Sequence, residues 1–288
     1  MMTNLDVFKP TAGICCLASR SGLGKDSWAV DYGGGLNFLR ALEMHQAHYV
    51  LLSAFCVGKP LLQFQFAKLK LEEEIRASQR CSHSIVRPTA YFKSLDGQIE
   101  SVRKGNSIMY FGDGTCSANA VSEKELAAYM VDCAINPLST DMLNETRNIG
   151  GPDVPPIPKR MQGEMIYDTL NIPPEKRKFV ALPLGIFDVL ISLFTGLESV
   201  FRTFKATQLA GKLGDGAEIA RIVKYYASEP MVSVGPKEVI GKMRLVDHFA
   251  AVAARGGQLE QIDQMTTTMG VLDLLSKNEY AATKEYPE

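Results

Sequence analysis

The first ninety residues alternate between short apolar runs and amphipathic stretches. Residues 12–18 and 49–57 are apolar runs bounded by polar or turn residues, which is typical of buried strands. Residues 84–87 (SIVR) predict a third strand, which Pro88 ends. Residues 31–46 carry leucines at helical spacing, and residues 64–78 have the pattern of a charged helix. Strand, helix, strand, helix, strand in this order predicts a parallel sheet with right-handed crossovers.

The pattern changes after this region. Residues 108–121 predict a hairpin that turns at a Gly-Asp-Gly sequence. Ser122 and Glu125 have the spacing of a capping box, so a helix is expected to begin there, and residues 162–170 predict another short helix. From residue 235 onward the chain is polar and only weakly periodic, which predicts little packed structure.

Residues 186–204 carry one continuous apolar face at helical spacing. The stripe consists of Ile186, Leu190, Leu193, Leu197, Val200 and Phe204, and it is widened by Phe187, Phe194 and Phe201. Proline, glycine and aspartate interrupt the surrounding apolar window, which disfavours a membrane-spanning helix. We expect a buried helix or a lid over a large hydrophobic substrate, with an interfacial membrane helix as the second interpretation.

The composition is that of a globular protein of one large or two ordinary domains, with 46% apolar and 22% charged residues in 288. A net charge of −1 excludes the basic surface of a non-specific nucleic-acid binder. The six cysteines contain no C-x-x-C pair, so we interpret them as reduced, with Cys15 and Cys16 buried on opposite faces of a strand. No histidine stands at zinc-ligand spacing from them, and no metal site is expected.

The glycine-rich stretches do not match a phosphate-binding loop. The Gly-Leu-Gly-Lys sequence at 22–25 lacks the Walker spacing, and Asp26 follows the lysine in place of Ser or Thr. The glycines at 211–216 follow an apolar helix and are interpreted as a helix stop. No dinucleotide fingerprint follows a predicted strand, so a Rossmann-like sheet in this chain is expected to be incomplete.

Ser53 lies in a predicted strand, and the helix after it contains Phe64-x-x-x-Lys68. Short-chain reductases line a nicotinamide with a serine at a strand end and a lysine one helical turn after a tyrosine. In this arrangement Lys68 would hold the cofactor ribose, and Ser53 would hydrogen-bond to the substrate side. Phe64 stands at the tyrosine position and has no proton to donate. The alternative interpretation is a solvated helix, with Lys68 among the charged residues at 70–74.

Longer stretches of the chain resemble one family. They include CLASRSGLGKDSWAVDY (16–32), HYVLLSAFCVGKPLLQFQFAKLKLE (48–72), SIVRPTAYFKSLDGQIESVRKG (84–105) and residues 111–133, 148–152, 162–170, 180–194 and 224–231. In unbroken order these stretches are similar to the divinyl chlorophyllide 8-vinyl-reductases, plastid and cyanobacterial members of the atypical short-chain dehydrogenase group. That family also tends to have Phe where other reductases place Tyr, as at Phe64.

The resemblance implies an activity, a location and a set of residues. Family members use NADPH to reduce the 8-vinyl group to ethyl, so the expected substrate is divinyl chlorophyllide or a related chlorophyll pigment, and the expected location is the chloroplast. The implied catalytic residues are Ser53 and Lys68. The implied cofactor-binding residues are Ser19, Arg20, Asn37, Lys68, Pro88, Thr89 and Ala90. The substrate pocket is expected to be lined by Phe64, Tyr91, Phe92, Phe187 and Phe194.

The expected fold class is α/β. An incomplete Rossmann-like parallel sheet would occupy residues 1–107, a smaller α+β substrate region 108–234, and a divergent, partly disordered or partner-binding tail 235–288. The family places a Gly-rich strand and two further strand–helix units before the position of Ile14, which have no counterpart here. This departure motivates an alternative: a non-catalytic relative that serves as a structural or assembly subunit of a photosynthetic membrane-protein complex. A third interpretation is a pigment-binding protein without the chemistry.

Overall fold

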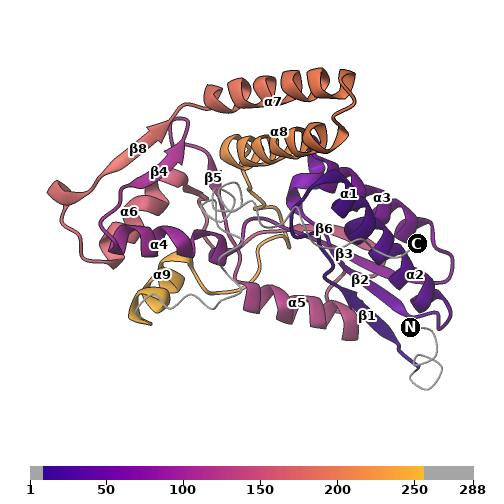
Figure 1. The fold of residues 1–288 in the computed structure, drawn as a ribbon. Coiled ribbons are helices and arrows are strands. Elements are labelled where there is room, and N and C mark those ends of the chain that lie inside the picture. Colours follow the sequence, from indigo (N-terminus) through magenta and orange to yellow (C-terminus); the bar gives the residue numbers. More distant parts are fainter. Residues whose placement is uncertain (1–8, 256–288) are drawn as a thin grey trace. The chain divides into compact units, whose positions relative to one another are not determined.

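The computed structural model describes residues 9–255, and these residues form two compact units (Figure 1). Unit 1 comprises residues 9–91, 116–158 and 229–244, and unit 2 comprises residues 92–115, 159–228 and 245–255. The two units therefore alternate along the chain. The sequence-based division at residues 107 and 234 is consecutive and stays a prediction.

Unit 1 is built around a four-stranded parallel sheet. Its elements are, in chain order, β1 (Ala12–Cys15), α1 (Gly24–Ser27), the π-helical segment η2 (Trp28–Gly34), α2 (Gly35–Glu43), β2 (His48–Leu52), the 3-10 segment η3 (Phe55–Gly58), α3 (Gln63–Ala77), β3 (His83–Pro88), β5 (Ser117–Ala118), α5 (Glu123–Ile135), β6 (Glu145–Ile149) and β7 (Ile157–Pro158). The strand order is β1-β2-β3-β6, and all neighbouring strands are parallel. The prediction of an α/β fold with a Rossmann-like parallel sheet is confirmed.

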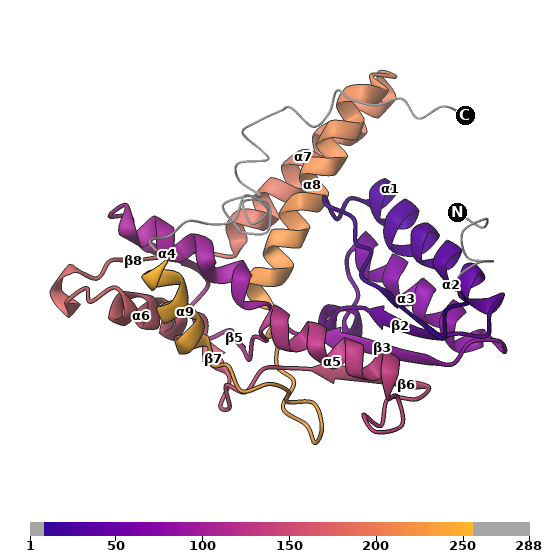
Figure 2. The same ribbon diagram turned by 90° about the horizontal axis from the view of Figure 1, so that it is seen from below.

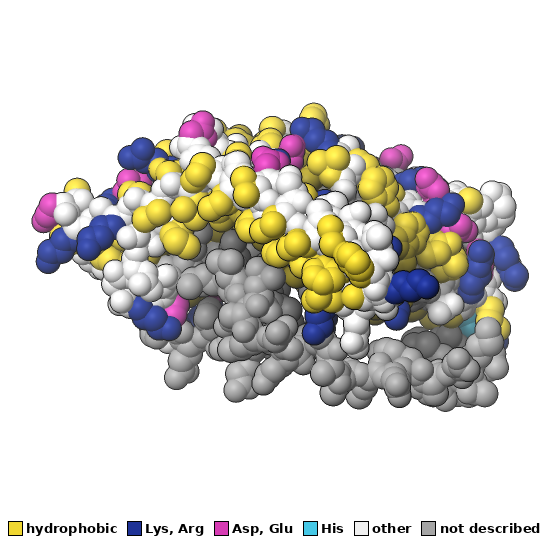
Figure 3. All heavy atoms as spheres, turned by 45° about the horizontal axis from the view of Figure 1, so that its top comes forward, with side chains coloured by type: hydrophobic (Ala, Val, Ile, Leu, Met, Phe, Trp, Pro, Cys, Tyr) yellow, Lys and Arg dark blue, Asp and Glu magenta, His cyan; other side chains and the backbone are white. Residues whose placement is uncertain are grey.

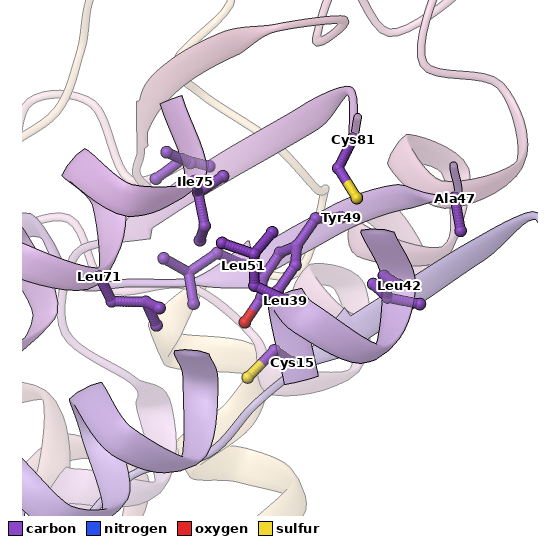
Figure 4. Packing of buried hydrophobic residues seen from close by; sticks show 10 residues of the cluster. Cys15, Leu39, Leu42, Ala47, Tyr49, Leu51, Leu71, Ile75 and Cys81 are labelled. Carbon is purple, nitrogen blue, oxygen red and sulfur yellow. The ribbon is translucent and has the colours of Figure 1, made fainter. Parts of the chain in front are cut away.

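Helices cover both faces of this sheet (Figure 2). Because successive residues of a strand point to opposite faces, Tyr49 and Leu51 of β2 pack beneath α2 and α3, whereas Val50 packs beneath α5. Figure 4 shows the first of these cores, to which the two helices contribute Leu39, Leu42, Leu71 and Ile75. Coverage of both faces explains why residues 49–52 of β2 are a continuous apolar run in the sequence.

β1 is an outer strand of the sheet, and part of it is exposed. Cys15 is buried in the core beneath α2, but Ile14, Cys16 and Leu17 are exposed. The expectation that both cysteines are buried is therefore wrong for Cys16. The physical reason is that β1 ends at Cys15, so Cys16 lies in the loop after the strand and does not occupy a strand position that faces a second helix layer.

Two expectations about residues 108–125 are also wrong. β4 (Ile108–Phe111) pairs in parallel with β8 (Phe179–Leu182), and β5 pairs with β7, so residues 108–121 do not form a hairpin. Ser122 is the N-cap of α5, but its side chain makes no capping hydrogen bond. The Glu125 carboxylate instead accepts a hydrogen bond from the backbone N–H of Lys242, at 2.7 Å. In both cases the residues pair with partners far away in the sequence, β8 for β4 and Lys242 for Glu125.

Unit 2 combines the β4–β8 pair with helices. Its elements are the 3-10 segment η4 (Phe92–Leu95), α4 (Asp96–Arg103), β4, α6 (Lys159–Thr169), the 3-10 segment η5 (Pro174–Lys176), β8, α7 (Gly185–Thr203), α8 (Thr207–Ser228) and α9 (Leu245–Ala254). α9 lies in the stretch whose weak periodicity predicts little packed structure, yet its Phe249 is fully buried. Residues 256–288 of that stretch lie outside the described residues.

α7 and α8 form an antiparallel hairpin (Figure 1). The glycines at 211–216 lie inside α8, so their interpretation as a helix stop is wrong. Their small size lets the two helices approach closely: a Cβ on Gly214 would lie 3.1 Å from the Glu198 carboxylate, and one on Gly216 would lie 3.5 Å from the Phe194 ring. No helix within residues 9–255 is long and apolar enough to cross a membrane.

His48 begins β2 and lies between two serines. Its Nδ1 is 2.8 Å from the Oγ of Ser82, its Nε2 is 2.9 Å from the Oγ of Ser84, and the ring is buried. Burial, and after it the neighbouring His83, lowers the pKa of His48 from 6.5 to about 4. The folded chain therefore holds this imidazole neutral at physiological pH.

We expect His48 to make the fold less stable as the pH falls from 6.5 towards 4. The unfolded chain takes up a proton on this ring below its ordinary pKa of 6.5, whereas the folded chain does so only near its lowered pKa of about 4. The full contribution is present above pH 6.5, and its loss by pH 4 is on the order of 3 kcal/mol. Urea unfolding of the parent and of His48→Gln at several pH values measures this loss. Equal pH slopes for the two proteins would contradict it.

Candidate cofactor site

The loops that follow the strands of unit 1 meet at one edge of the sheet, because the strands are parallel. Ser19 lies in the loop after β1, Ser53 is the first residue after β2, and Thr89 is the first residue after β3. α3 runs beside this edge and contributes Phe64 and Lys68. The structure thus brings one residue from each of three strand ends, together with α3, to the position at which open α/β sheets bind their ligands.

Lys68 forms a buried ion pair with Asp31 of η2. Its Nζ lies 2.9 Å from Asp31 Oδ1, and the two side chains are 9% and 1% exposed. The second carboxylate oxygen, Oδ2, accepts a hydrogen bond of 3.0 Å from the backbone N–H of Ser19. The Oγ atoms of Ser19 and Ser27 are 3.1 Å apart. Asp31 therefore fixes both the lysine and the loop after β1.

A second buried carboxylate lies one helical turn further along α3. Glu72 is fully buried, and its Oε1 accepts hydrogen bonds from the Oγ of Ser53 at 2.6 Å and from the Nε of Arg87 at 3.0 Å. Its Oε2 accepts from the terminal nitrogens of Arg87 and of Arg76, the latter at 3.0 Å. Burial alone would raise the pKa of Glu72, but the hydrogen bonds from Arg87 and Ser53 and the charge of Arg87 outweigh it and hold that pKa below its ordinary value.

Lys68 and Glu72 together define what we call the α3 site, with Asp31, Ser53 and Arg87 as its partners. The two α3 residues are four positions apart, so they project from the same face of the helix. The alternative interpretation of a solvated helix is wrong for these two residues, although it holds for the neighbouring Glu73 and Lys70, which are exposed. Phe64 precedes Lys68 by one turn and is half-buried.

The remaining cofactor-site predictions fall into two groups. Pro88 and Thr89 are buried and Ala90 is half-buried at the end of β3. Thr89 donates its hydroxyl hydrogen to the backbone oxygen of Asn119 at 2.7 Å. Arg20 and Asn37 are exposed, the first in the loop after β1 and the second on α2. A role of these residues in cofactor binding stays a prediction.

The predicted pocket residues are divided between the two units. Phe64 and Tyr91 belong to unit 1 and are half-buried, whereas Phe92, Phe187 and Phe194 belong to unit 2. The ring of Phe92 lies 5.1 Å from that of His248, and the ring of Phe187 lies 4.8 Å from that of Phe111. These rings already have partners within unit 2, and their contribution to a pigment pocket stays a prediction.

Sequence reasoning missed Asp31 and Glu72, the two carboxylates that organise the α3 site. A signal for Glu72 was present, because it follows Lys68 at helical spacing and shares its inward face. Asp31 lies in a segment predicted as the beginning of a helix. In the structure it is buried within the π-helical segment η2, and no sequence pattern predicts such a segment. Among residues 9–255 no group of three or more His, Cys, Asp or Glu side chains could hold a metal ion.

Solved structures with a similar fold include nucleotide-sugar enzymes. The dTDP-glucose 4,6-dehydratase of Bacillus anthracis, in complex with NAD, matches with a TM-score of 0.52 and 13% identity over 62% of this chain and 63% of its own. The UDP-glucuronic acid 4-epimerase of Bacillus cereus, in complex with UDP-glucuronic acid and NAD, matches with a TM-score of 0.52 and 15% identity over 63% and 65%. Together with the parallel sheet, these matches place the chain in the Rossmann-like α/β class.

Curated relatives make the placement more specific. The chloroplastic divinyl chlorophyllide a 8-vinyl-reductase of Zea mays is 43% identical over 270 residues, covering 88% of this chain and 63% of the relative. The Arabidopsis thaliana protein of the same name is 40% identical over 259 residues, covering 84% and 58%. The chain is a homologue of these reductases and spans about three fifths of the length of the relatives it matches. No family model matches it.

Proposed function

We propose that this chain is the part of an NADPH-dependent reductase that holds the nicotinamide ribose and the pigment, and that the reaction reduces the 8-vinyl group of divinyl chlorophyllide in the chloroplast. The observation that carries the proposal is the buried Lys68, which lies one turn after Phe64 at the ligand-binding edge of a Rossmann-like sheet. The homologues that share about 40% of its residues are chloroplastic 8-vinyl-reductases.

The α3 site fits a ribose. An ammonium group has three hydrogen-bond donors, and the contact with Asp31 uses one of them, so Lys68 keeps donors for a ribose diol. Bound NADPH would supply a hydride to one carbon of the vinyl group. The buried ion pair with Asp31 holds the Lys68 side chain in place, and Ser53 follows β2 at the same edge of the sheet. The proton for the other vinyl carbon comes from water or from the pigment, because Phe64 has no hydroxyl.

A non-catalytic role in a photosynthetic complex is the second candidate. The observation in its favour is that Lys68 and Ser53 both have protein partners, Asp31 and Glu72. Such a protein would keep the fold and the pigment surface but transfer no hydride.

The experiment is a segment exchange in the maize relative. The 270 matched residues of that reductase are replaced by the corresponding residues of this chain, and the product is incubated with divinyl chlorophyllide and NADPH. Formation of the monovinyl pigment, followed by chromatography, is expected. A folded exchange protein that binds the pigment without reducing it would contradict the proposal and favour the non-catalytic relative.

We expect the 288-residue chain itself to bind NADPH weakly. Rossmann folds hold the pyrophosphate with backbone N–H groups at a helix N-terminus after a Gly-rich turn. Among the described residues, β1 is followed by the four-residue α1, which carries Asp26 in its first turn, and this carboxylate repels phosphate. Isothermal titration should give a dissociation constant no tighter than about 100 μM, and a low-micromolar value would contradict this expectation.

Phe64→Tyr in the exchange protein should change the turnover number by less than about threefold, because the proposed chemistry does not use a proton from this position. The pigment-reduction assay measures this ratio. A gain of tenfold or more would mean that a tyrosine proton limits the reaction, and the assignment of proton transfer to water or pigment would then be wrong.

A further inference from the structure

α7 presents an exposed apolar face along its whole length. We call five of its positions, together with the C-cap residue Phe204, the α7 seam: Ile186, Leu190, Leu193, Leu197, Val200 and Phe204. Each is between 37% and 76% exposed, and Val189 beside them is exposed as well. Figure 3, in which the top of Figure 1 comes forward, shows apolar side chains gathered over this region. An exposed apolar patch of this extent marks an interaction site.

The seam is distinct from the face that α7 turns towards α8. That inner face carries Phe194, which packs on Gly216 of α8. The charged side chains of α7 also lie off the seam and are paired: Asp188 with Lys224 of α8, and Glu198 with Arg202 at 2.7 Å. The seam itself contains only apolar side chains, so burying it leaves no charge without a partner.

The spacing of the seam is that of a helix–helix interface. Steps of four and three residues alternate, which is the heptad pattern in which positions a and d form the contact. The pattern is the same from either end of the helix. Three pairs lie at equal distances from Thr195, namely Ile186 with Phe204, Leu190 with Val200, and Leu193 with Leu197. Two copies of α7 packed antiparallel would therefore set every seam residue opposite another seam residue, as a two-fold interface requires.

The exposed area also fits a second copy of the chain. Burying the seam and Val189 would remove on the order of 700 Å² from water on each copy, close to the roughly 800 Å² per partner of a standard interface. Small ligands prefer concave sites, and two hollows in unit 2, of about 570 and 300 Å³, contain no seam residue. Helices that lie on membranes are rich in Lys and Arg on their polar face, whereas the polar positions of α7 are mainly Ser and Thr, with Arg202 as the one basic side chain and Asp188 and Glu198 as acidic ones.

We propose that the α7 seam is a homodimer interface, in which the α7–α8 hairpins of two chains pack into an antiparallel four-helix bundle. The inference rests on the spacing and exposure of α7 and is independent of the proposed reductase activity, because the residues of the α3 site lie in unit 1.

Sedimentation velocity of the 288-residue chain tests the proposal. At about 10 μM the chain should be a dimer, and Leu193→Glu should weaken the dimer at least 30-fold because it places a charge in the central layer. Ser192→Glu is the matched control, since it adds the same charge one residue away on the polar face, and it should remain a dimer.

Cysteine pairing keeps the proposal testable if the Leu193→Glu variant fails to fold. In a background with Cys16→Ser and Cys116→Ser, where the other cysteines are buried, Leu193→Cys with Leu197→Cys should form a disulfide-linked dimer. Leu193→Cys alone should form no disulfide-linked dimer, because position 193 lies opposite Leu197 of the partner subunit. A monomeric parent, or a dimer that Leu193→Glu leaves intact, would overturn the proposal. So would a monomer that floats with phosphatidylcholine vesicles through this face, which would assign the seam to a lipid surface.

Discussion

Lys68→Ala in the exchanged maize reductase should lower the turnover number at least 100-fold. The buried ammonium group of Lys68 would no longer hold the ribose, and a misplaced nicotinamide loses the alignment that hydride transfer needs. The monovinyl product formed per minute measures the loss. Lys70→Ala is the matched control, because Lys70 lies on the same helix but is exposed and paired only with Glu73 and Glu74. It should retain the parent rate.

The Lys68→Ala variant also leaves the Asp31 carboxylate buried without its cation, which is destabilising in itself. The double variant Lys68→Met, Asp31→Asn removes both charges and keeps the volume, so it separates chemistry from stability. We expect it to melt near the parent temperature and to remain inactive. A double variant that keeps the parent rate would show that Lys68 plays no part in the reaction.

Glu72→Ala should lower the free energy of unfolding by about 3–5 kcal/mol, because it strands the Arg87 guanidinium and the Ser53 hydroxyl that the carboxylate accepts from. Glu73→Ala, its exposed neighbour, should change the unfolding free energy by less than about 0.5 kcal/mol. Urea denaturation of the three proteins at pH 7 measures both values. A similar effect of the two substitutions would contradict the role assigned to the buried carboxylate.

The Glu72 contribution has a predictable dependence on pH. The pKa of this group is lowered in the folded chain, so its contribution is fully present above the ordinary value of 4.5 and is lost as the pH falls through the lower folded value. The difference between parent and Glu72→Ala should therefore shrink only as the pH falls below 4.5.

The sheet of unit 1 could be predicted because its central strands, β2 and β3, are buried on both faces, and β1, β2 and β3 follow one another as βαβ units whose partners are close in the sequence. β2 and β3 follow the predicted runs closely at their starts. The pairing of β4 with β8 could not be predicted from the sequence, because the paired residues Ile108 and Phe179 are far apart in the chain. The residues that directly follow β4 offer a nearer partner, which gave the wrong prediction of a hairpin. A local pattern predicts pairing between neighbouring segments, whereas tertiary packing pairs β4 with the distant β8.

The candidate site was predicted only in part for the same reason. Lys68 and Ser53 were found from their spacing, but their partners were not. The sequence shows Glu72 in a run of three glutamates typical of a solvated surface, and only the approach of Arg87 from β3 makes its burial tolerable. The partners that allow a charged residue to be buried can lie far away in the sequence, so a pattern of neighbouring residues does not predict its burial.

The alternation of the two units along the chain has a consequence for how the protein can be divided. Within residues 9–255 the backbone passes from one unit to the other five times, the last time after Arg244. No single cut therefore separates the two units, because a break anywhere within residues 92–244 leaves parts of both units on each side of it. During synthesis, the four strands of the main sheet are made once Ile149 has emerged. Residues 229–244, whose backbone pairs with Gly150 just after β6 and with Ala118 of β5, are made much later. Nearly all of residues 9–255 must therefore be synthesised before either unit can fold completely.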